Sequence, residues 1–380
     1  MVFDSAGIRV TVSSAGAGTS MWTLVPEPQV TVGGEGLPGR VDGDHLFGRI
    51  GPGRLLPGGG FAVVDEMAQR VVLFHEDGSQ RATFGGGGDG PGEFRVVTGL
   101  AGVAGDTLVA FDTVNRRATT FTADGQLVSL VPLETEPYSR EGALLRGVGY
   151  VFRETWALVD ASPGSFARDT VTLTLFDLDG RRIRQLARVP GLRFYGVGQR
   201  PVIMPFTPEP AFATGVALYH LSGDRFEYTV VDVDGTVTHI GRLDVEPAAA
   251  TAGDMQSWHR WLRSQVPDDI PAAVLADLDR TFQAVPTPEA LPALSDLLLD
   301  GDDNVWVGEY RPSWARGARR WYVFDPAHRL EATVMVPGHV RVLDVRGDHV
   351  LVAAGEDLVP VVQVMELGRG PDTLALPVNP

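Results

Sequence analysis

The sequence predicts an all-β fold, a six-bladed β-propeller with a small helical insertion between blades 4 and 5. Two repeated motifs predict this fold. The first is a β-rich run that ends in an Asp-Gly pair, and the second is an apolar run that precedes the pair. Units of about forty to fifty residues with about four strands each are typical of propellers. A sandwich or a barrel would not explain repeats of this spacing.

The Asp-Gly pairs mark tight turns between neighbouring strands. They stand at Asp77-Gly78, Asp124-Gly125, Asp179-Gly180 and Asp234-Gly235, with a degenerate copy at 324–328. Asp and Gly tolerate the positive φ angles of short hairpins, so a pair between β-rich flanks predicts a hairpin turn. Each pair therefore places one strand before it and one after it.

The apolar runs are candidates for strands buried between neighbouring sheets, because they are apolar on both faces. They occupy residues 61–65, 108–112, 156–160, 216–220, 305–309 and 350–354. Six copies predict six blades, which we expect to begin near Arg54, Thr98, Leu144, Pro201, Pro292 and Val340.

The predicted ring uses residues 1–380 as a single propeller domain. Its last unit has only three clear strands. We therefore expect an N-terminal strand at about residues 28–33 to close the last blade, with residues 8–12 as a further contribution to it.

One segment, at about residues 251–284, departs from the β pattern. Its apolar residues recur at helical spacing in two stripes, namely Met255, Trp258, Trp261 and Leu262, then Val274, Leu275, Leu278 and Phe282. Such stripes predict two amphipathic helices. The hairpin they form could pack over an exposed blade edge, or it could act as a lid over the propeller mouth.

Composition restricts the chemistry that the chain can perform. Cysteine is absent and all 32 basic residues are arginine, which excludes disulfides, thiolate metal sites, Schiff-base lysines and the Walker-A lysine. Against these stand 48 acidic residues, and the resulting net charge of -16 argues against a nucleic-acid partner. No apolar run is long enough for a transmembrane segment.

Several segments resemble the repeats of NHL-type six-bladed β-propellers. Residues 85–94 (GGGGDGPGEF) look like the family's inter-blade loop, 108–117 like its V-x-D-x-x-N-x-R core, and 120–125 like its closing F-x-x-x-G. The first unit has Gln69-Arg70 where Asn-Arg is usual in the family. Residues 294–307 are similar to bacterial relatives that are mostly uncharacterised. The resemblance covers most of the chain.

The resemblance implies a location and leaves three functions open. Such bacterial relatives are frequently exported or lipid-anchored, so we expect a periplasmic, cell-surface or secreted protein whose signal segment is absent from this sequence. Family members include binding platforms, lyases and lactonases. The chain could therefore bind a small-molecule or protein ligand through its loop-rich face, act as a metal-dependent lactonase or lyase with a channel site, or be a structural subunit of a surface assembly. Its oligomeric state is open.

A column of polar residues follows the second strand of successive units. Its members are Asp65, Asp112, Asp160, His220 and Glu309, with Ala354 in the last unit. Loops after the second strand share a propeller face with the inter-blade loops, so these residues could surround one mouth of the channel. Clustered carboxylates need a neutralising group, which makes them candidate ligands for a divalent cation such as Ca²⁺, or for a cationic ligand. Alternatively, each aspartate caps its own loop by accepting hydrogen bonds from nearby amides.

Overall fold

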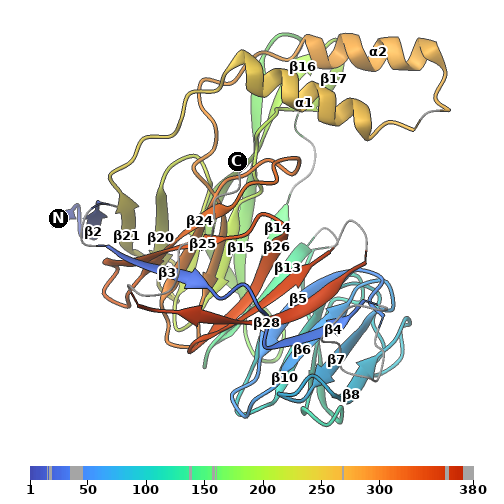
Figure 1. Cartoon of the computed structure of the whole chain (residues 1–380), viewed down its shortest axis with the longest axis vertical. Helices are drawn as coiled ribbons and strands as arrows, with labels where there is room; N and C mark the ends of the chain where they lie inside the picture. The colour runs from blue at the N-terminus through green and yellow to red at the C-terminus, as the bar shows by residue number, and fades with distance from the viewer. Residues whose placement is uncertain are drawn as a thin grey trace.

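The structure is a computed structural model, and it describes residues 1–14, 16, 19–34, 46–136, 139–155, 159, 161–267, 269–355 and 359–370. Within these residues the protein is mostly β, with two helices that lie apart from the sheets (Figure 1). The strands form consecutive antiparallel groups, each built from neighbours in sequence.

The first two groups have four strands each. They are β5 (Ile50–Leu55), β6 (Phe61–Asp65), β7 (Arg70–Phe74) and β8 (Gln80–Gly85), followed by β9 (Val97–Gly102), β10 (Leu108–Asp112), β11 (Arg117–Phe121) and β12 (Leu127–Pro132). In both groups the predicted Asp-Gly turn joins the third strand to the fourth. Gly78 and Gly125 have φ angles of 82° and 76°, a region that glycine enters without the steric cost of a Cβ atom.

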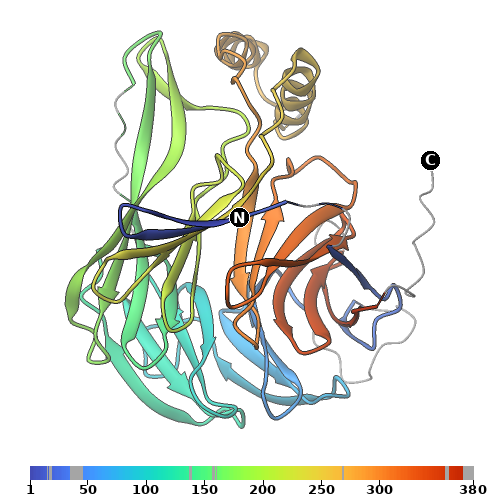
Figure 2. The same ribbon diagram turned by 90° about the vertical axis from the view of Figure 1, so that its left-hand side faces the viewer.

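The third group is the longest. It consists of β13 (Ser139–Leu145), β14 (Gly149–Thr155), β15 (Phe166–Phe176), β16 (Arg182–Val197) and β17 (Arg200–Ile203). The paired β15 and β16 extend well beyond the other strands, toward the level of the helices (Figure 2). This extension gives the third group a wall that the others lack.

The remaining strands of the repeat form three groups. They are β18 (Ala211–Thr214), β19 (Leu218–Leu221), β20 (Glu227–Val231) and β21 (Val237–Leu243), then β22 (Leu294–Leu299), β23 (Val305–Glu309), β24 (Arg319–Phe324) and β25 (Leu330–Val336), and last β26 (Val340–Arg346), β27 (His349–Ala354) and β28 (Val361–Gly368). Each of these groups receives a strand from the N-terminal segment.

The N-terminal strands are β1 (Val2–Ser5), β2 (Ile8–Ser13), β3 (Ser20–Leu24) and β4 (Val30–Gly33). Strand β4 pairs antiparallel with β28, with Val32 opposite Val362. The expectation that residues 8–12 contribute to the same place is wrong, because β2 pairs parallel with β21 instead. An outer strand carries a row of unpaired backbone groups, and β2 satisfies those of β21.

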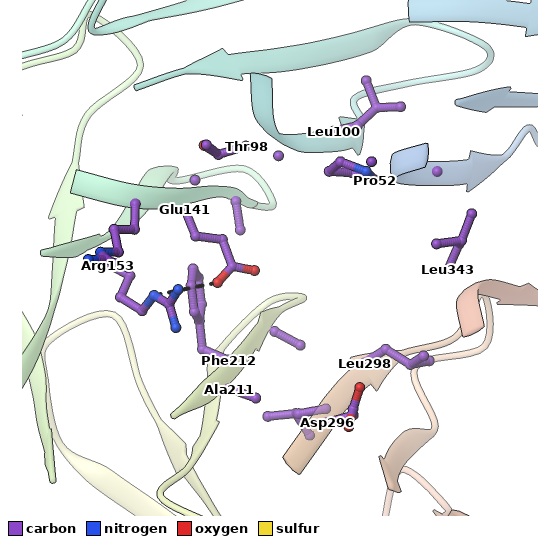
Figure 3. A pocket seen from close by; sticks show the side chains of 18 of the residues that line it. Pro52, Thr98, Leu100, Glu141, Arg153, Ala211, Phe212, Asp296, Leu298 and Leu343 are labelled. Carbon is purple, nitrogen blue, oxygen red and sulfur yellow. Dashed lines mark ion pairs between the residues drawn. The ribbon is translucent and has the colours of Figure 1, made fainter. Parts of the chain in front are cut away.

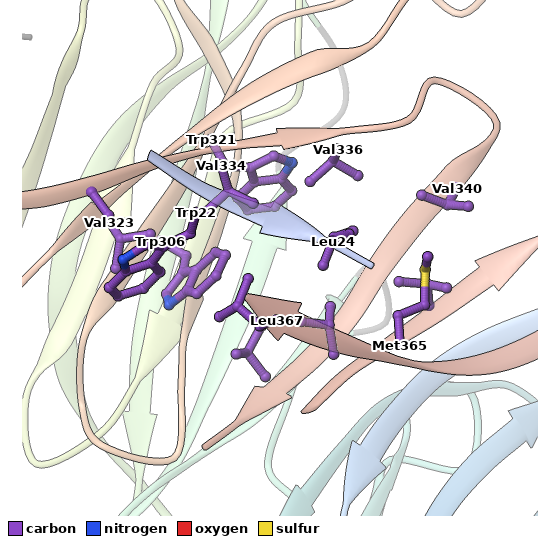
Figure 4. Close-up of a cluster of buried hydrophobic side chains, with 14 of the residues drawn as sticks. Trp22, Leu24, Trp306, Trp321, Val323, Val334, Val336, Val340, Met365 and Leu367 are labelled. Carbon is purple, nitrogen blue, oxygen red and sulfur yellow. The ribbon is translucent and has the colours of Figure 1, made fainter. Parts of the chain in front are cut away.

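Strand β3 connects two groups through a tryptophan cluster. It pairs parallel with β25 and antiparallel with the end of β28. Trp22 of β3 is 3% exposed, and its ring lies 6.1 Å from that of Trp306 (Figure 4). The N-terminal segment therefore belongs to the hydrophobic core and does not merely cover it.

Helices α1 (Ala252–Ser264) and α2 (Ala272–Gln283) lie between β21 and β22 in the chain. A capping box begins α1, in which the Thr251 hydroxyl accepts from the Asp254 amide and the Asp254 carboxylate accepts from the Thr251 amide. These reciprocal bonds satisfy amides that have no partner within the helix.

The helices pack on loops at one end of the molecule. Met255 and Trp258 of α1 are buried against Met204 and Phe206, and Trp261 lies beside Trp314 of the loop between β23 and β24. No residue of α2 is buried. The hairpin thus contacts the segment that leads into β18 and the upper ends of β16 and β17.

Candidate functional site

The first strands of all these groups line one central cavity of about 640 Å³. They are β5, β9, β13, β18, β22 and β26 (Figure 3). Glycines allow the close approach of neighbouring first strands. A Cβ atom at Gly99 of β9 would collide with the carbonyl oxygen of Gly142 of β13.

Glu141 of β13 points into this cavity and faces Arg153 of β14 (Figure 3). Its Oε2 lies 3.7 Å from Arg153 Nε. A β-bulge between Ser139 and Glu141 shifts the register against β14. The Glu141 side chain is 40% exposed, but only to a space that the protein encloses. Burial therefore raises the pKa of Glu141, and the nearby Arg153 offsets part of that shift.

Arg153 also holds the loop that leads into β18. Its Nη2 lies 2.7 Å from Glu209 Oε2, and its Nη1 donates to the Pro210 carbonyl at 3.1 Å. Arg140 approaches the same glutamate at 3.6 Å. We call Arg140, Glu141, Arg153 and Glu209 the ion cluster.

Other charged groups at the cavity form ion pairs of their own. Asp296 of β22 pairs with Arg319 at 2.7 Å. Asp344 pairs with Arg54 at 3.1 Å and accepts from the Leu55 amide at 2.8 Å. Burial raises the pKa of Asp344, and Arg54 opposes that shift. The cavity thus presents both signs of charge.

Two members of the predicted polar column are buried and accept hydrogen bonds from loop amides. Asp112 is 0% exposed and accepts from the amides of Arg95, Val96, Val114 and Asn115 at 2.7 to 3.2 Å. Asp65 accepts from the amides of Gly48 and Ala68 at 3.4 and 3.3 Å. These contacts match the loop-capping alternative.

In the third group, the predicted column residue Asp160 lies outside the described residues. Strand β14 ends at Thr155, and the residue at the structural position of Asp65 and Asp112 is Glu154. Glu154 is 2% exposed, accepts from the Thr174 hydroxyl at 2.6 Å and pairs with Arg182 at 2.6 Å. The sequence analysis missed Glu154, although its place four residues after Tyr150 repeats the spacing from Phe61 to Asp65.

His220 does not stand at the end of its strand. Leu218 pairs with Val231 as Phe61 pairs with Phe74, so the counterpart of Asp65 in this group is Ser222. His220 lies within β19, opposite Phe212. Burial lowers the pKa of His220 to about 4, which keeps the ring neutral at physiological pH.

Glu309 ends β23, as predicted, and contacts β24. It accepts from the Tyr322 hydroxyl at 2.6 Å and lies 3.6 Å from Arg320. Among the residues that the structure describes, no three His, Cys, Asp or Glu side chains are grouped to hold a metal ion. Neither described helix has the length and apolar character needed to cross a membrane.

Comparison with known proteins identifies relatives by structure only. No family model matches the sequence, and no curated protein matches it. A member of the DUF4221 family from Bacteroides vulgatus has a TM-score of 0.55 at 8% sequence identity, over 93% of this chain and 100% of that chain. A candidate exported protein from Bacteroides fragilis has a TM-score of 0.48 at 10% identity, over 95% of this chain and 99% of that chain.

A third similar structure is regucalcin, a calcium-binding protein from Agrobacterium tumefaciens. Its TM-score is 0.42 at 12% identity, over 86% of this chain and 93% or more of that chain (94%). The similarity to the DUF4221 member defines the class of this protein, which is mostly β with a β-propeller-like fold. At such low identity the similarity carries the fold alone.

Proposed function

We propose that this chain is a six-bladed β-propeller of the NHL type that binds a small polar ligand in its central cavity. The blades are β5–β8, β9–β12, β13–β17, β18–β21, β22–β25, and β26–β28 completed by β4. The segment from α1 to α2 is an insertion between blades 4 and 5 of a single domain. We further propose an exported location, periplasmic, cell-surface or secreted, as the NHL resemblance implies.

The observation that carries the binding function is the position of Glu141 opposite Arg153 in the central cavity. A charged group that protein surrounds loses hydration, and its pKa shift measures that loss. A ligand that brings a hydrogen-bond donor or a cation to Glu141 would restore the lost interactions. Titratable groups with shifted pKa values in a cavity are typical of binding sites.

The size and charge of the cavity indicate the kind of ligand. Its volume of about 640 Å³ is typical of small-molecule sites. Glu141 and Asp296 present negative charge, while Arg140 and Arg153 present positive charge. A zwitterion such as a free amino acid matches both signs at once.

The test is a calorimetric titration with a panel of free amino acids. We expect at least one to bind the wild-type protein, and Glu141→Gln to weaken that binding tenfold or more. Glu227→Gln is the matched control, because Glu227 is also paired with an arginine, Arg242 at 2.7 Å, but does not line the cavity. Unchanged affinity in Glu141→Gln would show that the ligand does not use this site.

A cation on Asp65, Asp112, Asp160, His220 and Glu309 is a separate proposal, which belongs to the metal-dependent lactonase or lyase. Its test is thermal unfolding with added Ca²⁺, Zn²⁺ or a chelator. A metal ion that binds only the native state raises the unfolding midpoint. An unchanged midpoint in all three conditions would remove the metalloenzyme from consideration.

The protein-ligand and surface-assembly alternatives depend on association. Light scattering of the purified protein tests self-association directly. A mass well above the 40.7 kDa of one chain would support an assembly, whereas a mass equal to one chain would favour the small-molecule site.

A further inference from the structure

We propose that a second cavity beside the central one is a binding pocket for a small apolar amine, whose ammonium group pairs with Asp169. This side cavity has a volume of about 190 Å³. Arg140, Arg153 and Glu209 of the ion cluster line both cavities, so the cluster forms their common wall. The inference deepens the proposed function and rests on it, since it assigns a ligand class to an extension of the same site.

The outer wall of the side cavity is apolar. It comes from the extended part of the third group, with Val171 on β15, Leu192 and Phe194 on β16, and Ile203 on β17. Ile203 is 50% exposed, an unusual position for a large aliphatic side chain that lines a cavity. A hydrocarbon group placed here would remove apolar surface from water.

Asp169 supplies the polar end of the pocket. Its side chain is 8% exposed, and within the described residues its Oδ1 has no hydrogen-bond partner. It lies opposite an irregular stretch of β16, where a Cβ atom at Gly191 would collide with Oδ1. Glycine at this position therefore makes room for the carboxylate.

The neighbouring arginine does not neutralise Asp169. Arg168 donates from Nε to the Gly191 carbonyl at 3.0 Å and from Nη1 to Asp224 at 2.7 Å. Burial accordingly raises the pKa of Asp169, and the positive charge of Arg168 offsets only part of the shift. A buried carboxylate oxygen without a donor is costly, and an ammonium group supplies both the donor and the opposite charge.

The volume sets the size of the apolar group. An apolar cavity of about 150 Å³ accommodates a benzene molecule, so the side cavity has room for one six-membered ring with a short arm. The net charge of -16 also favours a cation over an anion. An arylmethylamine is therefore the simplest compound that fits.

The test compares three probes with the same ring by calorimetry at pH 7.5: benzylamine, benzyl alcohol and benzoate. We expect benzylamine to bind at least tenfold more tightly than benzyl alcohol, and benzoate to show no binding. Equal affinity for benzylamine and benzyl alcohol would overturn the role of the carboxylate. Binding of benzoate in preference to benzylamine would overturn the ligand class.

Two variants assign the binding to this pocket. Asp169→Asn should weaken benzylamine tenfold or more, while Asp277→Asn, an exposed carboxylate on α2, should change nothing. If Asp169→Asn does not fold, Ile203→Trp tests the same pocket, because the larger side chain fills the cavity from an exposed position on β17. Benzylamine binding that survives both substitutions would refute the pocket.

Glu141→Gln distinguishes this inference from the proposed function. Benzylamine binding that depends on Asp169, together with amino-acid binding that depends on Glu141, supports both. Amino-acid binding without benzylamine binding refutes the side pocket alone. Benzylamine binding in a protein that binds no amino acid refutes the zwitterion site and leaves the amine pocket.

Discussion

The imidazole rings of His239 and His328 are stacked, with their centroids 3.9 Å apart and an angle of 26° between their planes. His239 belongs to β21, whereas His328 lies in the turn between β24 and β25. In that turn His328 has a φ angle of 63°, at the place where the other turns have glycine. Its Nδ1 lies 2.9 Å from the Tyr228 hydroxyl of β20. A residue that breaks the Asp-Gly pattern thus connects two neighbouring groups of strands.

This histidine pair should make the stability of the protein depend on pH. Burial lowers the pKa of His328 to about 4, with a further contribution from His239. Burial and the nearby Arg9 lower the pKa of His239 as well. An unfolded histidine titrates near pH ~6.5, so between that pH and about 4 the unfolded state binds more protons than the folded state. We expect the free energy of unfolding to be constant above pH 7 and to fall by about 2 kcal/mol as the pH drops toward 4, after allowance for the partial exposure of His328.

The measurement is urea unfolding at several pH values between 7.5 and 4. His328→Asn is the matched variant, because asparagine tolerates a positive φ and does not titrate in this range. The variant should show a smaller loss of stability on acidification than the wild type. Identical pH profiles would mean that other groups, among them the buried His220, cause the whole dependence.

Glu154 and Glu309 occupy equivalent strand ends but should contribute differently to stability. Glu154 is 2% exposed and pairs with Arg182 at 2.6 Å, whereas the Glu309 side chain is 31% exposed. Removing one partner of a buried ion pair leaves an uncompensated charge, so Glu154→Gln should lower the free energy of unfolding by about 3 kcal/mol. Glu309→Gln should cost less than about 1 kcal/mol. Urea unfolding of both variants checks the difference, and equal costs would contradict the structural role assigned to Glu154.

Much of the β architecture could be predicted from the turns, because an Asp-Gly pair restricts the backbone locally. Gly78, Gly125, Gly180 and Gly235 all have the expected positive φ angles. The polar column was predicted at Asp65, Asp112 and Glu309, which the register places at equivalent strand ends. It was misplaced in the fourth group, where the apolar run 216–220 begins two residues before β19.

The ion cluster could not be predicted from the sequence. Its residues come from β13, β14 and the loop before β18, which are far apart in the chain. The bulge at Ser139–Glu141 changes which side chains face the cavity, and a bulge has no signature in an alternating pattern. The long β15–β16 hairpin, which forms the wall of the side cavity, likewise interrupts the repeat at the third unit.

Trp22 should be as important for stability as a residue of the central repeat. It is 3% exposed within the tryptophan cluster that joins β3 to β25 and β28. Trp22→Ala should cost about 3 to 5 kcal/mol, through lost burial and the cavity left behind. Its neighbour Met21, which is 63% exposed, is the control, and Met21→Ala should stay within about 0.5 kcal/mol of the wild type. Similar unfolding midpoints for the two variants would show that β3 is dispensable for the fold.

Two glycines of β9 test whether close strand approach keeps the central cavity in shape. A Cβ atom at Gly99 would collide with the Gly142 carbonyl oxygen and lie 3.0 Å from the Phe111 ring, whereas a Cβ atom at Gly102 meets nothing within 4 Å. Gly99→Ala should therefore force β9 and β13 apart and cost about 1 to 3 kcal/mol. Gly102→Ala should be neutral or slightly stabilising, because it only restricts the unfolded chain. Chemical unfolding gives both values, and binding of the amino-acid probe should weaken only in Gly99→Ala, since β13 also carries Glu141. Equal behaviour of the two variants would mean that the inner strands adjust without a change in the cavity.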